Sequence, residues 1–140
     1  MEWLRLAIDY GIIGLLLAMS IAAVAIAIER HLVYRQLHLA EYSNRRELEL
    51  VLTRKLHLIA TIGSNAPYIG LLGTVLGIML TFQTMGRDGF VNTGSIMTGL
   101  SLALKATAVG LLVAIPSVAL YNLLLRKVKV LLMQWEIDHG

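Results

Sequence analysis

The sequence has 140 residues, of which 57% are hydrophobic and 15% are charged, and its formal net charge is +3. This apolar excess is too large for an ordinary soluble domain and indicates a membrane protein. The chain has no cysteine, which excludes disulfides and thiolate metal sites. Because the basic residues gather beside apolar stretches, membrane topology and anionic lipid explain the positive charge better than nucleic acid does.

Three long stretches carry no Asp, Glu, Lys or Arg, at residues 10–28, 56–86 and 106–125. A membrane-spanning helix needs about 20 mostly apolar residues, so each stretch is long enough to cross a bilayer. The sequence therefore predicts an all-α membrane protein, a single domain 1–140 with three transmembrane helices. These are expected at about 8–28, 64–85 and 102–125, with a loop at 29–63 and a tail at 126–140.

The segments on either side of the first span also have helical features. Residues 1–9 alternate apolar and charged groups, which predicts a short interfacial helix anchored by Trp3. Residues 28–58 contain no Gly or Pro, and Leu and Val recur there at roughly helical spacing. We therefore expect the loop to form long cytoplasmic helical extensions, two arms with a turn near Ser43 and Asn44, and not a folded domain.

The distribution of Lys and Arg predicts the orientation of the chain. The loop has six of them, at Arg30, Arg35, Arg45, Arg46, Arg54 and Lys55, and the tail has three, at Arg126, Lys127 and Lys129. The other side has Arg5 and Arg87, and Lys105 is not assigned to either side. Since cytoplasmic segments are richer in basic residues, the N-terminus is expected outside the cytoplasm and the C-terminus inside it. The residues interpreted as topology and lipid contacts are Arg30, Arg35, Arg126 and Lys127.

The second span has a stripe of small and weakly polar residues. On a helical wheel its members fall within about 100°, and they are Gly63, Pro67, Gly70, Thr74, Gly77, Thr81 and Thr84. Small residues let helices approach closely in lipid. Pro67 either begins the membrane helix or kinks a longer one. Residues 86–89 predict a turn, and residues 92–95 offer N-caps for the helix that follows.

The third span has two faces. One face carries a small-residue stripe that ends on an aromatic residue, formed by Ala103, Thr107, Gly110, Ala114 and Tyr121. Roughly opposite lie Thr98, Ser101 and Lys105. Pro116 is a candidate for a kink at mid-membrane.

The threonines of the two stripes are the main candidates for a functional site. In one interpretation Thr74 and Thr107 bond their own helix backbones and help packing. In the other they line a polar path, where their hydroxyls hydrate the path or hydrogen-bond an ionisable group of a partner. The small residues expected on the same pore face are Gly70, Gly77, Thr81, Gly110 and Ala114.

Lys105 is the one charged residue inside the expected third span. Buried charges in membranes are costly and usually functional. However, Lys105 lies at the outer edge of the span, where its side chain is able to reach the interface. Both interpretations stay open, and Asp9 is the candidate for an ion pair with Lys105. Pro67 and Tyr121, like Lys105, are candidates for contacts with a partner or a neighbouring subunit.

No residue pattern points to an enzyme or to a cofactor. The four histidines lack metal-ligand spacing with carboxylates, and there is no phosphate loop or nucleophile constellation. No Asp or Glu lies within the spans apart from Asp9 at the start of the first, although proton carriers usually have an intramembrane carboxylate or His. If this chain works with protons, another chain should supply the titrating group. Glu29 and Arg30 mark the exit of the first span, with a cytoplasmic ion entrance as the alternative.

Two sequence motifs resemble the MotA/TolQ/ExbB proton channel family, and within it the ExbB branch first and the TolQ branch next. They are GSNAPYIGLLGTVLGIMLTF at 63–82 and LKATAVGLLVAIPSVALYN at 104–122. The resemblance implies a pentamer in the bacterial inner membrane, around a dimer of single-span ExbD-like helices whose membrane aspartate takes up the proton. Thr74 and Thr107 match the family's pore threonines.

The resemblance also implies how energy is used. Proton motive force would drive a motion that a TonB-like protein passes on to outer-membrane nutrient transporters. The expected partners are thus further copies of the chain, the ExbD-like and TonB-like proteins, and membrane lipids.

The chain departs from the family pattern in several places. Many relatives have a Glu five residues before the pore threonine, where this chain has Leu102, and the loop is much shorter than in the longest members. A MotA-like motor role is disfavoured because the chain lacks a fourth membrane helix and a large cytoplasmic domain. The alternatives are a TolQ-like subunit, a scaffold that stabilises partner proteins without conducting, and a small transporter.

Overall fold

The computed structural model describes residues 2–89 and 92–139, which are helical apart from short connections. The elements are α1 (Glu2–Gln36), the 3-10 turn η1 (Leu39–Glu41), α2 (Arg45–Leu52), α3 (Leu56–Asp88) and α4 (Thr93–His139). No strand occurs within these residues, so the predicted all-α class is confirmed. The three long helices α1, α3 and α4 are long and apolar enough to cross a membrane.

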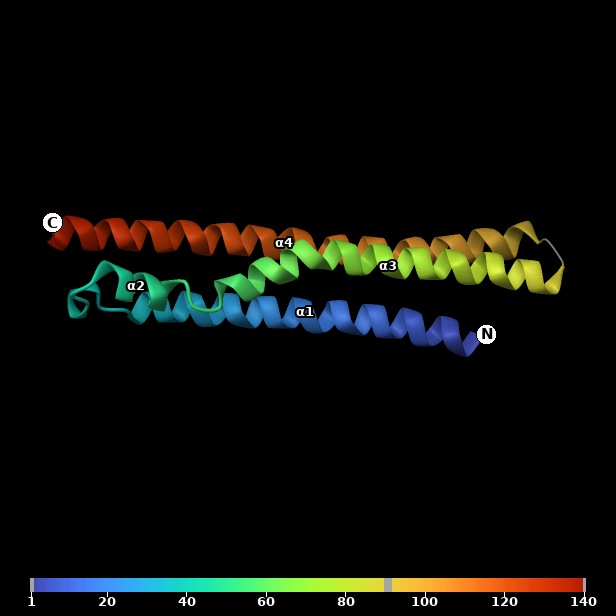
Figure 1. Ribbon diagram of the computed structural model, residues 1–140, viewed down its shortest axis with the longest axis horizontal. Coiled ribbons are helices and arrows are strands. Elements are labelled where there is room, and N and C mark those ends of the chain that lie inside the picture. The colour runs from blue at the N-terminus through green and yellow to red at the C-terminus, as the bar shows by residue number, and fades with distance from the viewer. Residues whose placement is uncertain (1, 90–91, 140) are drawn as a thin grey trace.

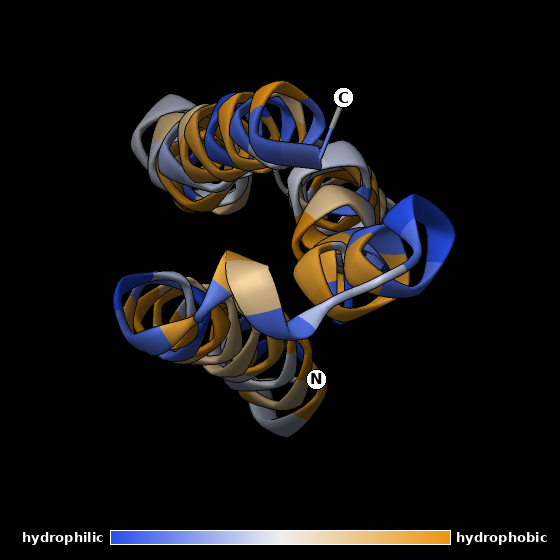
Figure 2. Ribbon diagram, turned by 90° about the vertical axis from the view of Figure 1, so that its left-hand side faces the viewer, coloured by the Kyte–Doolittle hydropathy of each residue, from blue (hydrophilic) through white to orange (hydrophobic). Residues whose placement is uncertain are grey.

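The three long helices lie side by side in an elongated bundle (Figure 1). Helices α1 and α4 run in the same direction, and α3 runs in the opposite direction. The short α2 lies beside the last turns of α1, at the end of the bundle where the chain's C-terminus also lies. Apolar residues occur on several sides of the long helices (Figure 2). A helix that is apolar around its circumference is typical of a membrane span.

The ends of the helices differ in part from the sequence expectations. Residues 2–9 are the first turns of α1 and not a separate interfacial helix, since nothing there interrupts the backbone hydrogen bonds; Met1 lies outside the described residues. The turn near Ser43 and Asn44 is confirmed, because the Asn44 side chain accepts a hydrogen bond from the Arg46 N–H at 3.0 Å and caps α2. The second arm is broken at residues 53–55, between α2 and α3.

Pro67 lies inside α3 and does not begin it, so the second of the two sequence alternatives, a longer helix that contains Pro67, is the one observed. Helix α4 likewise continues through Pro116. At the far end α3 runs on to Asp88, and the turn expected at 86–89 begins only at Gly89, which has φ 62°. The Asn92 side chain accepts from the Gly94 N–H at 2.9 Å and caps α4, as the sequence predicted.

Helices α3 and α4 form the most extensive contact in the molecule. Gly70 and Gly110 face each other in it: a methyl group built on Gly70 would lie 2.6 Å from the Ala106 carbonyl oxygen, and one on Gly110 would lie 2.7 Å from that of Ala66. The two backbones therefore touch directly. In lipid the hydrophobic effect does not drive helices together, so dispersion contacts of this kind hold the pair.

The bulky part of the core lies at the other end, where α2 is inserted. Leu48, Leu52 and Ile59 are fully buried there and pack with Tyr34 and with residues of α4. The core within the apolar stretches is smaller and is built around Leu16, Ala66, Val113 and Ala114. The molecule thus has a core like that of a soluble helical bundle at the α2 end and a thin contact of small residues elsewhere.

We predict that Gly70→Ala lowers the stability of the bundle by about 1–3 kcal/mol, because the new methyl group meets backbone atoms and forces α3 away from α4. Gly14→Ala is the matched control, since nothing lies within 4 Å of a methyl group at that position. Thermal unfolding in detergent measures both. Equal melting temperatures for the two variants would contradict the close approach at Gly70.

Candidate functional site

The hydroxyl groups of Thr74 and Thr107 meet in the contact between α3 and α4. The two oxygens are hydrogen-bonded to each other. The Thr74 hydroxyl also lies 2.8 Å from the Ala103 carbonyl oxygen and 3.3 Å from that of Gly70. A hydroxyl has one proton to donate and two lone pairs. Thr74 therefore donates to a backbone carbonyl and accepts the proton of Thr107, so that the pair is satisfied without water.

Small residues make this meeting possible. Gly77 leaves room for Ala103, since a methyl group on Gly77 would lie 2.8 Å from the Ala103 side chain. Thr74 is only 6% exposed, whereas Thr107 is half-buried and keeps one edge open. The structure places the predicted small residues Gly70, Gly77, Gly110 and Ala114 in or beside this contact, where all four are buried. Their role on the face of a pore stays a prediction.

A second polar position lies closer to the C-terminal end of α3 in the same contact. The Thr81 hydroxyl donates to the Gly77 carbonyl oxygen at 2.9 Å and accepts from the Arg5 guanidinium at 3.0 Å. Gly99 faces Thr81 and provides the space. The sequence predicted Thr81 on this stripe but not Arg5, because Arg5 is 76 positions away in the chain. Arg5 thereby ties the start of α1 to the α3–α4 contact.

Ser117 is a buried polar residue that the sequence analysis did not single out. It is 3% exposed and donates to the Val113 carbonyl oxygen at 2.8 Å. Its position seven residues after Gly110 places it on the same stripe of α4, a signal that was available in the sequence. Four polar side chains of α3 and α4 are thus distributed along one apolar contact, at Thr74, Thr81, Thr107 and Ser117.

The structure does not bring Lys105 and Asp9 into an ion pair. Both line a cavity of about 250 Å³ between α1, α3 and α4, but no salt bridge joins them within residues 2–89 and 92–139. The Lys105 side chain is exposed, and Leu102 lines the same cavity. Tyr121 is half-buried against the core at the α2 end, and Pro67 is half-buried on α3.

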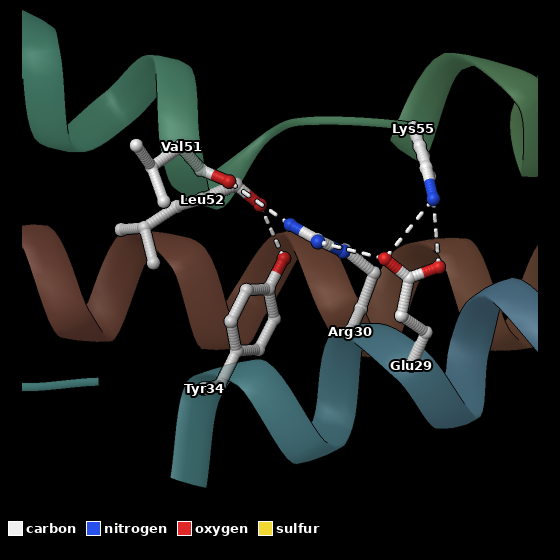
Figure 3. Close-up of polar contacts among 6 residues, drawn as sticks. All are labelled: Glu29, Arg30, Tyr34, Val51, Leu52 and Lys55. Carbon is white, nitrogen blue, oxygen red and sulfur yellow. Dashed lines mark hydrogen bonds and ion pairs between the residues drawn. The ribbon is translucent and has the colours of Figure 1, made fainter. Parts of the chain in front are cut away.

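A polar cluster joins α1 to the junction between α2 and α3 (Figure 3). The Lys55 ammonium group lies 2.9 Å and 3.0 Å from the two Glu29 carboxylate oxygens. The Arg30 guanidinium donates to the Val51 carbonyl oxygen at 2.9 Å and to Glu29 at 3.2 Å. The Tyr34 hydroxyl donates to the Leu52 carbonyl oxygen.

This cluster satisfies the free end of α2. The last carbonyls of a helix have no partner within the helix and carry partial negative charge, so a cation there is favourable. Arg30 supplies that positive charge and a hydrogen bond, and the neutral Tyr34 hydroxyl supplies a second hydrogen bond. Arg30 is only 4% exposed, which corrects its interpretation as a lipid contact, while Arg35, Arg126 and Lys127 are exposed. Glu29 is held in an ion pair with Lys55, which gives no support to an ion entrance there.

No group of three or more His, Cys, Asp or Glu within the described residues could hold a metal ion. The polar groups in the contact between α3 and α4 are a row of hydroxyls, on a bundle of three apolar helices. These features define a polytopic helical membrane protein with a buried polar seam.

Comparison with known proteins identifies the family of this membrane protein. Residues 27–137 match the MotA/TolQ/ExbB proton channel family. The chain is 56% identical over 140 residues to the biopolymer transport protein ExbB of Aquifex aeolicus, covering 100% of this chain and 95% of that protein. It is 47% identical over 137 residues to ExbB of Helicobacter pylori, covering 98% and 94%. The chain belongs to the MotA/TolQ/ExbB proton channel family, and the resemblance seen in the sequence is confirmed.

A more distant relative matches only part of the chain. ExbB of Salmonella typhimurium is 43% identical over 70 residues, which are 50% of this chain and 29% of that protein.

We predict that Thr74 and Thr107 are energetically coupled. A double-mutant cycle with Thr74→Val, Thr107→Val and the double variant should give a coupling free energy of about 0.6 kcal/mol and at most about 1.7 kcal/mol, the range found for hydrogen bonds between membrane helices. Reversible unfolding in mixed micelles measures it. Strict additivity would show that the two hydroxyls do not interact in the folded chain.

A second prediction concerns Lys55, which has φ 69° in the left-handed region. Lys55→Met and Lys55→Gly both remove the ion pair with Glu29, but only glycine relieves the backbone, by about 1 kcal/mol. We therefore expect Lys55→Gly to be the more stable of the two in denaturant unfolding. If Lys55→Met equals or exceeds it, the left-handed conformation at this junction carries no cost.

Proposed function

We propose that this chain is the membrane subunit of a proton-driven, TonB-type energy-transducing system. Membership of the MotA/TolQ/ExbB proton channel family supports a role in a proton channel. Relatives named ExbB support the ExbB branch of that family. In this proposal the chain works with an ExbD-like partner and passes energy through a TonB-like protein for nutrient import across the outer membrane. A TolQ-like role in the related Tol system is the alternative within the family.

The observation that carries the proposal is the hydrogen-bonded pair of Thr74 and Thr107 in the contact between α3 and α4. A hydroxyl that both accepts and donates is able to relay a proton or to hold a carboxyl group in place. Thr107 is half-buried, so the pair has an edge that a partner's side chain is able to approach.

The titrating group in this proposal comes from another chain. Residues 10–28, 56–86 and 93–135 contain no Asp or Glu, so none of the apolar helices has a carboxylate of its own at mid-span. A single-span partner with a membrane aspartate would supply it, in a central pore lined by α3 and α4. A ring of identical chains, with the same interface repeated around an axis, is the natural way to close such a pore, and a pentamer is the size that we propose.

The orientation follows from the basic residues. We propose that the loop between α1 and α3 and the C-terminal end of α4 lie in the cytoplasm of a Gram-negative cell, with the N-terminus in the periplasm. The helical extensions around α2 and the end of α4 are then cytoplasmic. Their soluble-type core of Leu48, Leu52 and Ile59 is consistent with that surrounding.

Two functions from other classes compete with this one. A scaffold would stabilise partner proteins in the membrane and would need the threonines only for packing. A small transporter would need a substrate site at mid-membrane, usually beside a broken helix, whereas α3 and α4 are continuous through their prolines. No observation favours either of them over the proton-channel role.

We predict that Thr107→Val abolishes uptake of an iron chelate driven by proton motive force, while the assembly stays intact in native mass spectrometry. Valine keeps the shape of threonine and removes the hydroxyl. Thr107→Ser should keep uptake, and Thr98→Val is the matched control, since Thr98 is exposed on another face of α4.

The scaffold function makes the opposite prediction for this experiment. Normal uptake with Thr107→Val would show that the threonine pair serves only for packing, and it would favour the scaffold function. Loss of uptake in the Thr98→Val control would show that the assay reports general damage to α4 and not a property of the seam.

A further inference from the structure

An apolar groove runs between α1 and α4 at the end of the bundle that contains α2. Its volume is about 320 Å³, and its lining is formed by Val24, Ala27, Ile28, His31, Leu120, Leu123 and Leu124. Six of these seven residues are aliphatic, and His31 is the one polar residue among them. The groove is open to the outside of the chain, since Leu123 is 68% exposed and Ile28 is 56% exposed. It is separate from the threonine seam between α3 and α4.

Basic side chains continue the groove toward the C-terminal end. Helices α1 and α4 run in the same direction, so the next turn of each lies at the same end of the groove (Figure 1). Arg35 follows His31 by four residues on α1, and Lys127 follows Leu123 by four residues on α4. Residues at this spacing lie on one face of a helix. Both side chains are exposed, and neither forms a salt bridge within the described residues.

A second copy of this chain is a poor match for that basic end. In the helices around the groove, Glu29 is the one carboxylate of residues 10–36, and it is already paired with Lys55. Residues 56–87 and 93–135 contain no Asp or Glu. Another copy packed in register would therefore bring apolar surface but no free carboxylate from its long helices to this level, and its nearest exposed carboxylates would be Glu41 and Glu47 at or beside α2. A lipid with an apolar tail and an anionic head matches both the aliphatic groove and the basic residues at its end.

We infer that the groove binds an anionic phospholipid, with an acyl chain along the aliphatic residues and the phosphate group against Arg35, Lys127 and His31. Each basic residue near an anionic headgroup strengthens binding by about fivefold, and a long acyl chain gains further from every buried methylene group. The lipid would fill the space between α1 and α4 and hold their spacing. This inference does not rest on the proposed proton function, because its readout is lipid binding.

The test is native mass spectrometry of the purified full-length assembly in detergent, titrated with phosphatidylglycerol or with phosphatidylcholine. We expect phosphatidylglycerol to bind at lower concentration than phosphatidylcholine. Lys127→Gln should weaken phosphatidylglycerol binding about fivefold and the Arg35→Gln/Lys127→Gln double variant about 25-fold, without changing phosphatidylcholine binding. The control is Lys129→Gln, which is exposed on the opposite face of α4 and should have no effect.

A second pair of variants tests the apolar part of the groove. Leu123→Trp should fill it and reduce binding of both lipids. Leu112→Trp adds the same bulk to α4 at a position that is 72% exposed and does not line the groove, so lipid binding should be unchanged. Circular dichroism checks that each variant remains helical.

Three outcomes would overturn the inference. Equal binding of the two lipids would show that the basic residues do not recognise an anionic headgroup. Equal effects of Lys127→Gln and Lys129→Gln would show that the headgroup does not bind at the end of this groove. The chain has no cysteine of its own, so a photoreactive cross-linker attached at Leu123→Cys reacts with whatever covers the groove. A high yield of cross-linked dimers in native membranes would show that a second copy, and not lipid, covers it.

Discussion

The direct contact between the backbones of α3 and α4 at Gly70 and Gly110 is the constraint on which the rest of the structure depends. Only because neither residue has a side chain do the two helices come close enough for Thr74 to reach both Thr107 and the Ala103 carbonyl oxygen. A larger residue at either glycine would separate these groups and leave each hydroxyl only the carbonyl oxygens of its own helix as partners. The hydrogen bonds in this contact therefore depend on its close packing, and a change that loosens the packing also breaks them.

The two ends of the bundle are stabilised in different ways. In the apolar stretches, small side chains and dispersion contacts hold the helices, since lipid gives no hydrophobic drive for their association. Around α2, large buried residues such as Leu48, Leu52 and Ile59 give the kind of core that forms in water. Arg30 and Tyr34 then fix the end of α2 to α1 through its last carbonyls. The short connection at 53–55 joins α2, which belongs to this core, to α3, which continues into the apolar part of the bundle.

The sequence predicted what repeats at regular intervals and missed what depends on contacts between distant segments. The three apolar helices and the threonine stripe were predictable because the periodicity of a single helix places Thr74 with Gly70 and Thr107 with Gly110. The hydrogen bond from Arg5 to Thr81 and the capping of α2 by Arg30 were not, because each requires the relative position of two helices. The left-handed conformation of Lys55 also gave no signal, since glycine or asparagine usually marks such a position.

The arrangement of charges has a consequence for how the surroundings act on the protein. Every salt bridge of the described residues lies at the α2 end, among Glu29, Arg30, Lys55, Arg45, Glu49 and Glu136. The contact between Thr74 and Thr107 contains no ion pair, so ionic strength leaves it unchanged, whereas salt screens exposed pairs such as Arg45 with Glu49. Changes in the ionic composition of the aqueous phase therefore act on the salt bridges at the α2 end more than on the uncharged contact between Thr74 and Thr107.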